Sequence, residues 1–342
     1  MRYKLFGNTG LRVSEICLGT MTFGEDWGWG ASKEESRKIF DVFAEAGGNF
    51  LDTANLYTNG TSEKFVGEFI ASDREYFVVA TKYTLMNRSG DPNAAGNHRK
   101  NMVQSVEGSL RRLKTDYIDL LWVHAWDYLT PVEEVMRGLD DLVRSGKVLY
   151  VGVSDTPAWI VARANTMATL RGWTPFSGLQ IEYSLVERTP ERELLPMARS
   201  LGLAVTPWAP LAAGVLTGKF LGKKLPEDTR VKEGSPRLTE RNLKIASEVV
   251  KVAEEAGCTP AQVAINWLRQ QEGTIIPIVG ARKVEQIKDN LGALEHHLSE
   301  EHMQRLNDIS KIELGFPHEF LQREFIKEVL YAGTYDKIEK PK

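Results

Sequence analysis

Eight short apolar runs recur along the chain, each bounded by residues that favour turns. The runs are continuously apolar rather than alternating, which is typical of strands buried on both faces of a parallel sheet. Helical patterns lie between them, as in Ser32 to Ala46, where Ser32 and Glu35 form a capping box, and in Pro131 to Lys147. The predicted strands are Ile16 to Thr20, Asn49 to Asp52, Tyr76 to Lys82, Ile118 to His124, Leu149 to Ser154, Gly178 to Tyr183, Leu203 to Trp208 and Thr274 to Val279.

Strands that alternate with helices predict an α/β fold, and eight of them close most simply into a (β/α)8 TIM barrel. An N-terminal β-hairpin is predicted from Tyr3 to Phe6 and Leu11 to Val13, because the Asn and Gly residues between them suit a tight turn. An open doubly wound sheet is the alternative. It is weakened because Gly28 and Gly30 are followed by Lys33, where the third glycine of a dinucleotide fingerprint would stand.

About seventy residues separate the last two predicted strands, and this interval holds two extra helical patterns, Glu240 to Ala256 and Pro260 to Gln271. It also holds the polar loop Gly222 to Pro236, and loops of this length are usually lids or disordered segments. We expect residues 1–342 to form a single domain. The aromatic-rich tail, residues 311–342, is expected to be a C-terminal extension that packs near the rim of the barrel.

Composition narrows the class of protein further. Lys+Arg 43 and Asp+Glu 46 give a net charge of −3, and the scatter of both signs argues against a nucleic-acid partner. Cys17 and Cys258 lack CxxC spacing, so neither a disulfide nor a zinc site is predicted, and a reducing cytoplasm fits. No apolar run approaches the roughly 20 residues of a membrane span, and the amino terminus lacks the apolar segment of a signal peptide. We predict a cytoplasmic protein without a bound metal or membrane partner, and its oligomeric state stays open.

Four ionisable residues stand at the ends of three consecutive predicted strands or in the loops after them. Asp52, Lys82 and His124 each close an apolar run, and Tyr57 follows Asp52 by five positions. Any one of them alone is more simply explained as a structural residue. Because the carboxyl ends of parallel barrel strands meet at one rim, however, the four can converge in one pocket.

Such a set suits one kind of chemistry. A tyrosine hydroxyl, with an ordinary pKa of about 10, protonates an oxygen near neutral pH only if that pKa is lowered. Lys82 would lower it by stabilising the tyrosinate, and Asp52 would keep Lys82 charged and oriented. His124 could then position a carbonyl oxygen against the Tyr57 hydroxyl. A protonated carbonyl accepts hydride, which no side chain supplies, so the set implies a nicotinamide cofactor.

The four residues, together with the motifs LDTANLY, GVSD and PIVGARKVEQIKDN, resemble the aldo-keto reductase family. The resemblance covers nearly the whole chain, from Gly19 to Asn290. It implies that the four residues are the catalytic tetrad, and that the protein reduces aldehydes or ketones to alcohols. It also implies that NADP(H) binds extended across the barrel mouth without a Rossmann domain.

The resemblance further implies how the cofactor is held. Ser154 and Gln180 should hold the nicotinamide carboxamide, and Trp208 should stack on the ring. Arg282 should meet the 2′-phosphate, while Gln286 and Asn290, on the same helix face, should meet the adenine; a solvated polar helix face is the bland alternative. The other implied cofactor-binding residues are Gly19, Thr20, Met21, Asp52, Asp155 and Gly280, with Leu211, Gly214 and Lys219 along the pyrophosphate.

One position departs from the family's common GVSN pattern, because GVSD stands here. Asp155 donates no hydrogen bond unless it is protonated, which puts a contact to the carboxamide oxygen or the substrate in question. The same Asp, with the segments LLWVHAWDYLTPVEEVM and GVSDTPAWIVARANTMA, resembles the aryl-alcohol dehydrogenase branch of the family. Trp29, Tyr83 and Trp126 are candidates for an aromatic wall of a substrate pocket, although packing would explain them equally well.

A second function stays open at this point. The potassium-channel β subunits resemble the same family, so the chain could be a cofactor-binding regulatory subunit of a membrane protein. Metal-dependent sugar isomerisation is less favoured, because the strand ends offer few carboxylates and one well-placed histidine.

Overall fold

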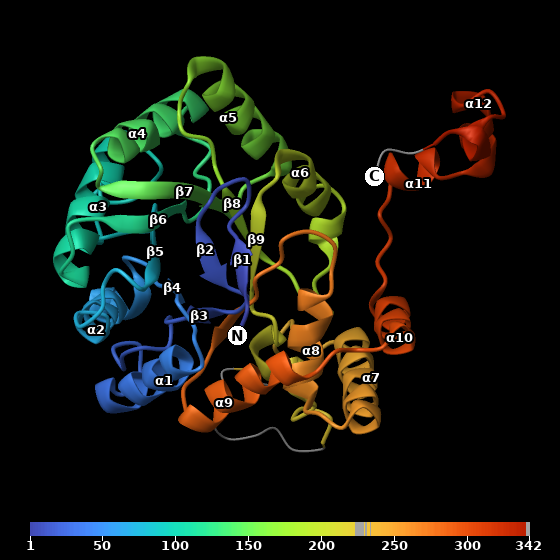
Figure 1. Cartoon of the computed structure of the whole chain (residues 1–342), viewed down its shortest axis with the longest axis horizontal. Coiled ribbons are helices and arrows are strands. Elements are labelled where there is room, and N and C mark those ends of the chain that lie inside the picture. Colours follow the sequence, from blue (N-terminus) through green and yellow to red (C-terminus); the bar gives the residue numbers. More distant parts are fainter. Residues whose placement is uncertain (223–228, 230, 233, 340–342) are drawn as a thin grey trace.

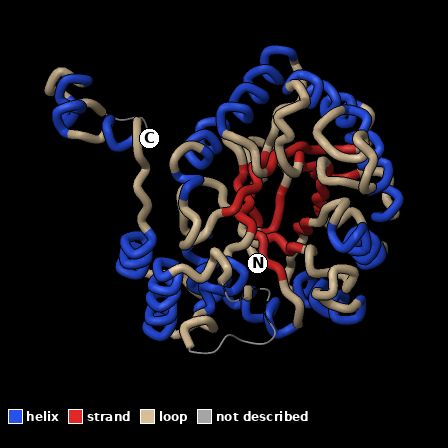
Figure 2. The backbone as a smooth tube through the Cα atoms, turned by 180° about the vertical axis from the view of Figure 1, so that it is seen from behind, coloured by secondary structure: helices blue, strands red, loops and turns tan. Residues whose placement is uncertain are grey.

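A ring of eight parallel strands forms the centre of the computed structural model, which describes residues 1–222, 229, 231, 232 and 234–339. Figure 2 shows this ring in red with the helices around it. Neighbouring strands are hydrogen-bonded in the order β10-β3-β4-β5-β6-β7-β8-β9. Their bounds are β3 (Cys17–Gly19), β4 (Phe50–Asp52), β5 (Val78–Tyr83), β6 (Ile118–Val123), β7 (Val148–Ser154), β8 (Gly178–Glu182), β9 (Ala204–Trp208) and β10 (Ile278–Gly280).

The ring closes between β9 and the segment just before β10. The Val205 N–H donates to the Thr274 carbonyl at 2.8 Å, and the Ile276 N–H donates to the Val205 carbonyl at 2.8 Å. Pro277 has no N–H to donate, and β10 starts only after it, so the strand is shorter than the predicted run. The predicted (β/α)8 TIM barrel is confirmed.

Helices cover the outside of the ring (Figure 1). The interval between β9 and β10 holds α7 and α8, as predicted, and α7 packs against α10 outside the barrel. The predicted polar loop Gly222 to Pro236 lies largely outside the described residues. The helices are α1 (Lys33–Glu45), α2 (Thr61–Phe69), α3 (Arg99–Leu113), α4 (Val132–Arg144), α5 (Ala158–Arg171), α6 (Leu194–Leu201), α7 (Glu240–Ala256), α8 (Pro260–Arg269), α9 (Val284–Gly292), α10 (Glu300–Ser310), α11 (His318–Leu321) and α12 (Glu324–Leu330).

Helix α1 begins with only half of the predicted capping box. The Ser32 hydroxyl accepts a hydrogen bond from the Glu35 N–H at 3.2 Å, as a capping residue should. The Glu35 carboxylate does not return to the Ser32 backbone, because it accepts instead from the Val284 N–H at 2.9 Å. It thereby satisfies a free amide at the amino end of α9. The second half of the predicted capping box is therefore wrong, because the Glu35 carboxylate bonds another helix.

The N-terminal hairpin closes one end of the barrel (Figure 1). Its strands β1 (Tyr3–Leu5) and β2 (Arg12–Ser14) are antiparallel, as predicted. Phe6, directly after β1, packs edge-on against Phe50 and Trp122 with ring centroids 5.7 Å and 6.1 Å away. A Cβ on Gly178 would lie 2.4 Å from the Phe6 ring, so only glycine at position 178 leaves room for Phe6 at this end of the barrel. The open end, where the strands have their carboxyl ends, is called the mouth below.

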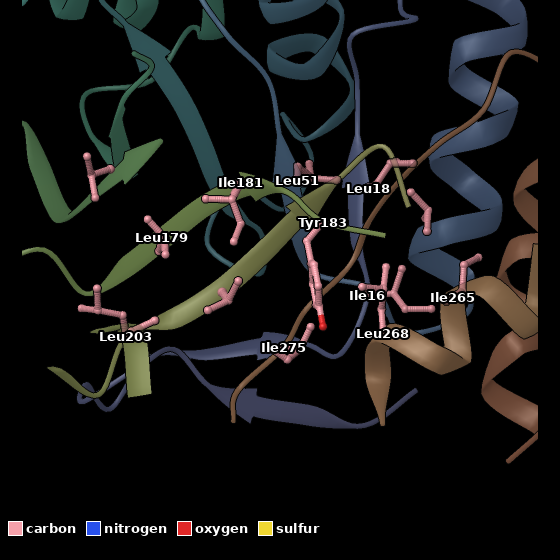
Figure 3. Close-up of a cluster of buried hydrophobic side chains, with 14 of the residues drawn as sticks. Ile16, Leu18, Leu51, Leu179, Ile181, Tyr183, Leu203, Ile265, Leu268 and Ile275 are labelled. Carbon is pink, nitrogen blue, oxygen red and sulfur yellow. The ribbon is translucent and has the colours of Figure 1, made fainter. Parts of the chain in front are cut away.

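Most of the hydrophobic core lies between the strands and the surrounding helices. Side chains alternate along a strand, so one set of residues faces the barrel interior and the other faces the helices. Figure 3 shows part of the outer layer, with Leu179 and Ile181 of β8 and with Ile265 and Leu268 of α8. This layer holds the strands rigidly and fixes where their carboxyl ends lie.

The tail leaves the barrel after α10. The Glu313 carbonyl accepts from Arg192 at 2.8 Å, but α11 and α12 bury none of their residues, and Phe316 and Phe325 are 84% and 72% exposed. Figures 1 and 2 show both helices beside the ring rather than over it. Nε2 of His318 in α11 lies 3.1 Å from the carboxylate of Glu193, which stands between β8 and α6, so packing of the tail near the rim stays a prediction. Whether residues 1–342 behave as one domain stays a prediction.

No helix among the described residues is both long enough and apolar enough to cross a lipid bilayer.

Candidate active site

The structure brings the four predicted catalytic side chains together at the mouth. The Lys82 ammonium lies between the others, donating to the Asp52 carboxylate, to the Thr53 carbonyl at 2.8 Å and to the Tyr57 hydroxyl at 3.2 Å. The rings of Tyr57 and His124 meet edge to face, with centroids 6.0 Å apart. The result is a hydrogen-bonded chain from Asp52 through Lys82 to Tyr57, with His124 beside its end.

Alternation along β5 decides which residues reach this site. Val78, Ala80 and Lys82 face the barrel interior, whereas Val79 and Tyr83 belong to the layer between strands and helices. Lys82 therefore ends in the mouth with none of its side chain exposed.

Tyr83 is consequently not a pocket residue, contrary to the sequence-based prediction. It is fully buried, and its hydroxyl donates to the Asn97 carbonyl at 3.2 Å. Neighbouring residues of one strand point to opposite sides, so Lys82 and Tyr83 cannot both face the mouth.

Burial dominates the protonation of Tyr57. It raises the pKa of the hydroxyl above its ordinary value, and the Lys82 ammonium opposes the rise without cancelling it. The net lowering predicted from the sequence is thus wrong for the protein alone. Burial also works against the charge on Lys82, but Asp52 and Tyr57 outweigh it, and the pKa of Lys82 is raised. At neutral pH Tyr57 is a protonated hydroxyl beside a charged ammonium.

His124 is neutral at the same pH. Burial lowers its pKa well below the ordinary value, and the Lys82 ammonium adds to the effect. Its Nδ1 is buried and has no hydrogen-bond partner within the described part of the chain. A neutral imidazole still carries one N–H, so His124 can donate a hydrogen bond without bringing a second positive charge to the site.

The ends of β7, β8 and β9 carry the residues expected around a nicotinamide. Ser154 is buried, and its Oγ has no hydrogen-bond partner among the residues described. Gln180 uses its amide N–H to bind the Asp52 carboxylate at 2.9 Å. Trp208 donates its indole N–H to Asp155 at 3.2 Å. A buried hydroxyl without a partner in the described chain and an indole at the end of another strand on the same rim suit an amide-bearing flat ring.

The segment after β9 has the shape expected of a pyrophosphate cradle. Leu211 precedes the 3₁₀ helix Ala212–Thr217, in which Ala213 and Gly214 have φ values of 56° and 91°. A Cβ on Gly214 would lie 2.8 Å from Nζ of Lys219, so glycine leaves room there for the ammonium. Backbone amides in such a turn, together with a nearby cation, can bind an anion.

The residues expected at the far end of the cofactor are only partly arranged as predicted. Arg282 is half-buried just before α9, and its backbone N–H donates to Oε1 of Gln286 at 2.8 Å. The carbonyl of the Gln286 amide is therefore engaged in holding the Arg282 backbone. Asn290 is buried at 3% exposure, and Gly280 is exposed at the end of β10.

Gly19, Thr20 and Met21 lie where β3 opens into the mouth. Gly19 ends β3, and Thr20 donates through both its N–H and its hydroxyl to the Asp52 carbonyl, at 2.9 Å and 3.0 Å. Met21 is half-buried. In this structure Thr20 holds the Asp52 backbone.

Comparison with known proteins identifies the family to which this site belongs. The model of the Aldo/keto reductase family matches residues 15–311, which include all four tetrad residues.

The chain belongs to the aldo/keto reductase family.

Named relatives agree. The aryl-alcohol dehydrogenase [NADP(+)] of Phanerodontia chrysosporium is 42% identical, over 98% of this chain and 92% of its own length. A putative aryl-alcohol dehydrogenase of Saccharomyces cerevisiae is 40% identical, over 92% of this chain and 88% of its own. Norsolorinic acid reductase of Aspergillus flavus is 40% identical, over 93% and 83%. The resemblance stated from the motifs is confirmed, and the channel-subunit alternative receives no support.

The aldo/keto reductase chain is therefore an oxidoreductase that reduces aldehydes or ketones to alcohols. Its site contains residues that the sequence-based prediction missed. A buried hydroxyl network supports the tetrad from behind, because Ser62 bonds the Thr20 and Thr53 hydroxyls at 2.8 Å and 2.9 Å. Ser62 also donates to the Thr20 carbonyl at 2.8 Å. Nothing in the spacing of Ser and Thr residues along the sequence indicated this cluster.

Trp27 is the second omission. Its ring meets Tyr57 edge to face at 6.5 Å, and it contacts Trp29 at 5.7 Å. The prediction named Trp29, which lies next to Trp27. Trp126 is half-buried on the loop after β6, as expected for a rim residue. The alternation of Trp and Gly in the first loop could have indicated both indoles.

The Trp126 loop is held in place by a reciprocal pair that was also missed. The Asn97 N–H donates to the Asp127 carboxylate at 2.7 Å, and the Asp127 N–H donates to Oδ1 of Asn97 at 2.7 Å. Asn97 further donates to the Ala125 carbonyl at 2.8 Å. These bonds join the loops after β5 and β6 and fix one side of the rim.

The half-buried, neutral His124 predicts a specific acid sensitivity. Between pH 6.5 and its lowered pKa, the unfolded chain binds a proton at this residue that the native chain does not, so stability falls as pH falls. From pH 7 to 5.5 the wild type should lose about 1 kcal/mol more of its free energy of unfolding than His124→Gln. Urea unfolding of both proteins at the two pH values measures the difference. Equal losses would mean that His124 is not held neutral in the native state.

Proposed function

We propose that this aldo/keto reductase uses NADP(H) to reduce aldehydes, aromatic ones in particular, with Tyr57 as the general acid. The observation that carries the proposal is the buried hydrogen-bonded chain from Asp52 through Lys82 to Tyr57, with the neutral His124 beside the Tyr57 hydroxyl. Site residues of this kind perform proton transfer to a carbonyl oxygen. When bound, the nicotinamide supplies the hydride that this chemistry requires.

Each member of the chain has its own role in that reaction. His124 donates its N–H to the substrate carbonyl oxygen and so orients it. Tyr57 gives its proton to the same oxygen, and the Lys82 ammonium stabilises the phenolate that remains. Asp52 keeps Lys82 charged inside a site that excludes water.

The residues present fit the cofactor. Ser154 offers a hydroxyl that has no partner among the described residues, and Trp208 offers an indole face for the ring. Gly214 and Lys219 suit the pyrophosphate, and Arg282 suits a 2′-phosphate because guanidinium binds phosphate bidentately. The name of the Phanerodontia relative includes NADP(+), which supports the same cofactor.

Aromatic aldehydes are the proposed substrate class for two reasons. Trp27 and Trp126, with Trp29 behind, supply aromatic surface beside Tyr57 and on the rim, and flat rings stack well on indole. Two of the relatives are named for aryl alcohols. The test is loss of NADPH absorbance with aromatic aldehydes, aliphatic aldehydes, methylglyoxal and aldoses. Saturable oxidation favouring the aromatic group is expected; equal rates across the panel would remove the substrate assignment.

Arg282→Ala should lower the affinity for NADPH much more than the affinity for NADH. Loss of charge-assisted hydrogen bonds to the 2′-phosphate should raise the Kd of NADPH at least tenfold, on the order of 1.5–3 kcal/mol, and leave that of NADH nearly unchanged. Fluorescence titration with each cofactor gives the two constants. Lys283→Ala is the matched control, since it removes a neighbouring positive charge and should have a smaller effect. Equal losses for NADPH and NADH in Arg282→Ala would show that Arg282 does not read the phosphate.

The remaining assignments are also proposals. A cytoplasmic location is supported by Cys17 and Cys258, which are both free thiols. A small carbonyl or alcohol is the proposed partner, and no nucleic-acid partner is proposed because the charges are scattered.

A further inference from the structure

Asp155 and Trp208 are joined by a hydrogen bond across the mouth. Asp155 directly follows β7, Trp208 ends β9, and β8 runs between these two strands. Nε1 of Trp208 donates to Oδ1 of Asp155 at 3.2 Å. The Asp155 N–H is itself tied to β8, because it donates to the Gln180 carbonyl at 3.3 Å. The carboxylate is thus anchored on the barrel and holds an indole that ends another strand.

The backbone at both ends of this bond is unusual. Asp155 has a φ of 42°, and Ala209, which follows Trp208, has a φ of 52°. Both values lie in the left-handed region, which costs free energy for residues other than glycine and tends to persist at functional sites. Sharp turns directly after β7 and β9 therefore set the directions in which the two side chains leave their strands.

Two other side chains around the expected nicotinamide site each have one partner already. The Gln180 amide N–H is bound to Asp52 at 2.9 Å, and the Asp155 carboxylate is bound to Trp208. Ser154, whose Oγ is buried without a partner within the described part of the chain, is left to meet the carboxamide. An acceptor-only carboxylate suits an indole, which can only donate.

We propose that Asp155 is a positioning residue that fixes the plane of the Trp208 indole for stacking, and that it does not bind the carboxamide itself. This inference rests on the proposed function, because it assigns Trp208 to the nicotinamide. Asp155 is exposed at the mouth, where partial desolvation by its surroundings raises the pKa of the carboxyl and the bond from Trp208 works in the opposite direction.

A double-mutant cycle tests the coupling. Asp155→Gly removes the acceptor without straining the positive φ, and Trp208→Phe removes the donor while leaving a ring. Each should weaken NADPH binding by about five- to tenfold, consistent with loss of one hydrogen bond to a charged group. The double variant should bind NADPH no less tightly than the single variant with the lower affinity, because both changes break the same interaction. If the loss of NADPH affinity in the double variant equals the product of the two single losses, the proposal is overturned.

Asp155→Asn is the conservative variant. Its Oδ1 can still accept from the indole, so it should recover most of the affinity lost in Asp155→Gly. A loss as large as that of Asp155→Gly would show that the acceptor is not what matters at this position.

A measurement without cofactor separates this inference from the proposed function. In NMR spectra of the free protein, the Trp208 indole N–H, assigned by its absence in Trp208→Phe, should exchange with water more slowly in the wild type than in Asp155→Gly. Equal exchange rates would overturn the positioning role even if NADPH binds and turnover is fast. Slow exchange in a protein that binds no NADPH would instead overturn the proposed function, and the stacking role with it.

Discussion

Tyr57→Phe is expected to lower the turnover of an aldehyde by about 10²- to 10⁴-fold, the usual contribution of a general acid. The substitution keeps the ring that packs edge-on against Trp27 and His124 and removes only the hydroxyl that Lys82 contacts at 3.2 Å. Cofactor affinity should therefore change little. Steady-state rates with NADPH, together with a fluorescence titration of NADPH, measure the two quantities separately.

Tyr83→Phe is the matched control for that experiment. It removes the hydroxyl of a fully buried tyrosine that directly follows Lys82, but this hydroxyl donates to Asn97 in the layer between strands and helices. The cost should be about 1 kcal/mol of unfolding free energy, with turnover unchanged. Full turnover in Tyr57→Phe would refute the mechanism. A large loss in Tyr83→Phe would refute the division between inward and outward residues of β5.

Lys82→Met is expected to damage both stability and catalysis. Methionine fills a similar volume but leaves the Asp52 carboxylate buried with the Gln180 amide and without its cation. Breaking a buried ion pair on one side typically costs about 3–5 kcal/mol, and urea unfolding should show a loss of that order. Turnover should fall at least as far as in Tyr57→Phe, because the phenolate loses its stabilising charge.

The double variant Asp52→Asn/Lys82→Met separates the two effects. Removing the stranded carboxylate should restore much of the lost stability, since replacing both partners of a buried pair is far less costly than removing one. Turnover should stay low, because no ammonium faces Tyr57. A double variant that is as unstable as Lys82→Met would mean that the carboxylate is not the source of the cost. Recovered turnover would mean that Lys82 is dispensable for the chemistry.

The sequence predicted the architecture well because its evidence is local and repeated. Continuous apolar runs, helical spacing between them and turn residues at their ends recur eight times, and each repeat supports the same interpretation. Positions directly after a strand, such as His124, could be assigned to one rim because all strands of a parallel barrel end on the same side. The tetrad could be found in this way before any distance was known.

The predictions that the structure overturned depended on the tertiary environment rather than on neighbouring residues. Glu35 bonds the amino end of α9, about 250 residues later in the chain, instead of completing its own capping box. Burial at the mouth, which no sequence pattern measures, reverses the expected shift in the Tyr57 pKa. Tyr83 is the exception, since its neighbour Lys82 already indicated that it faces outward.

By itself, the sequence determined the order of strands and helices, the barrel, the family and a set of four side chains that meet at the mouth. Only the tertiary structure decided two further pairings at the mouth, Gln180 with Asp52 and Trp208 with Asp155. The reason is that periodicity and turn preference are properties of neighbouring residues. Hydrogen-bond partners and desolvation arise only when the strands close around a common mouth.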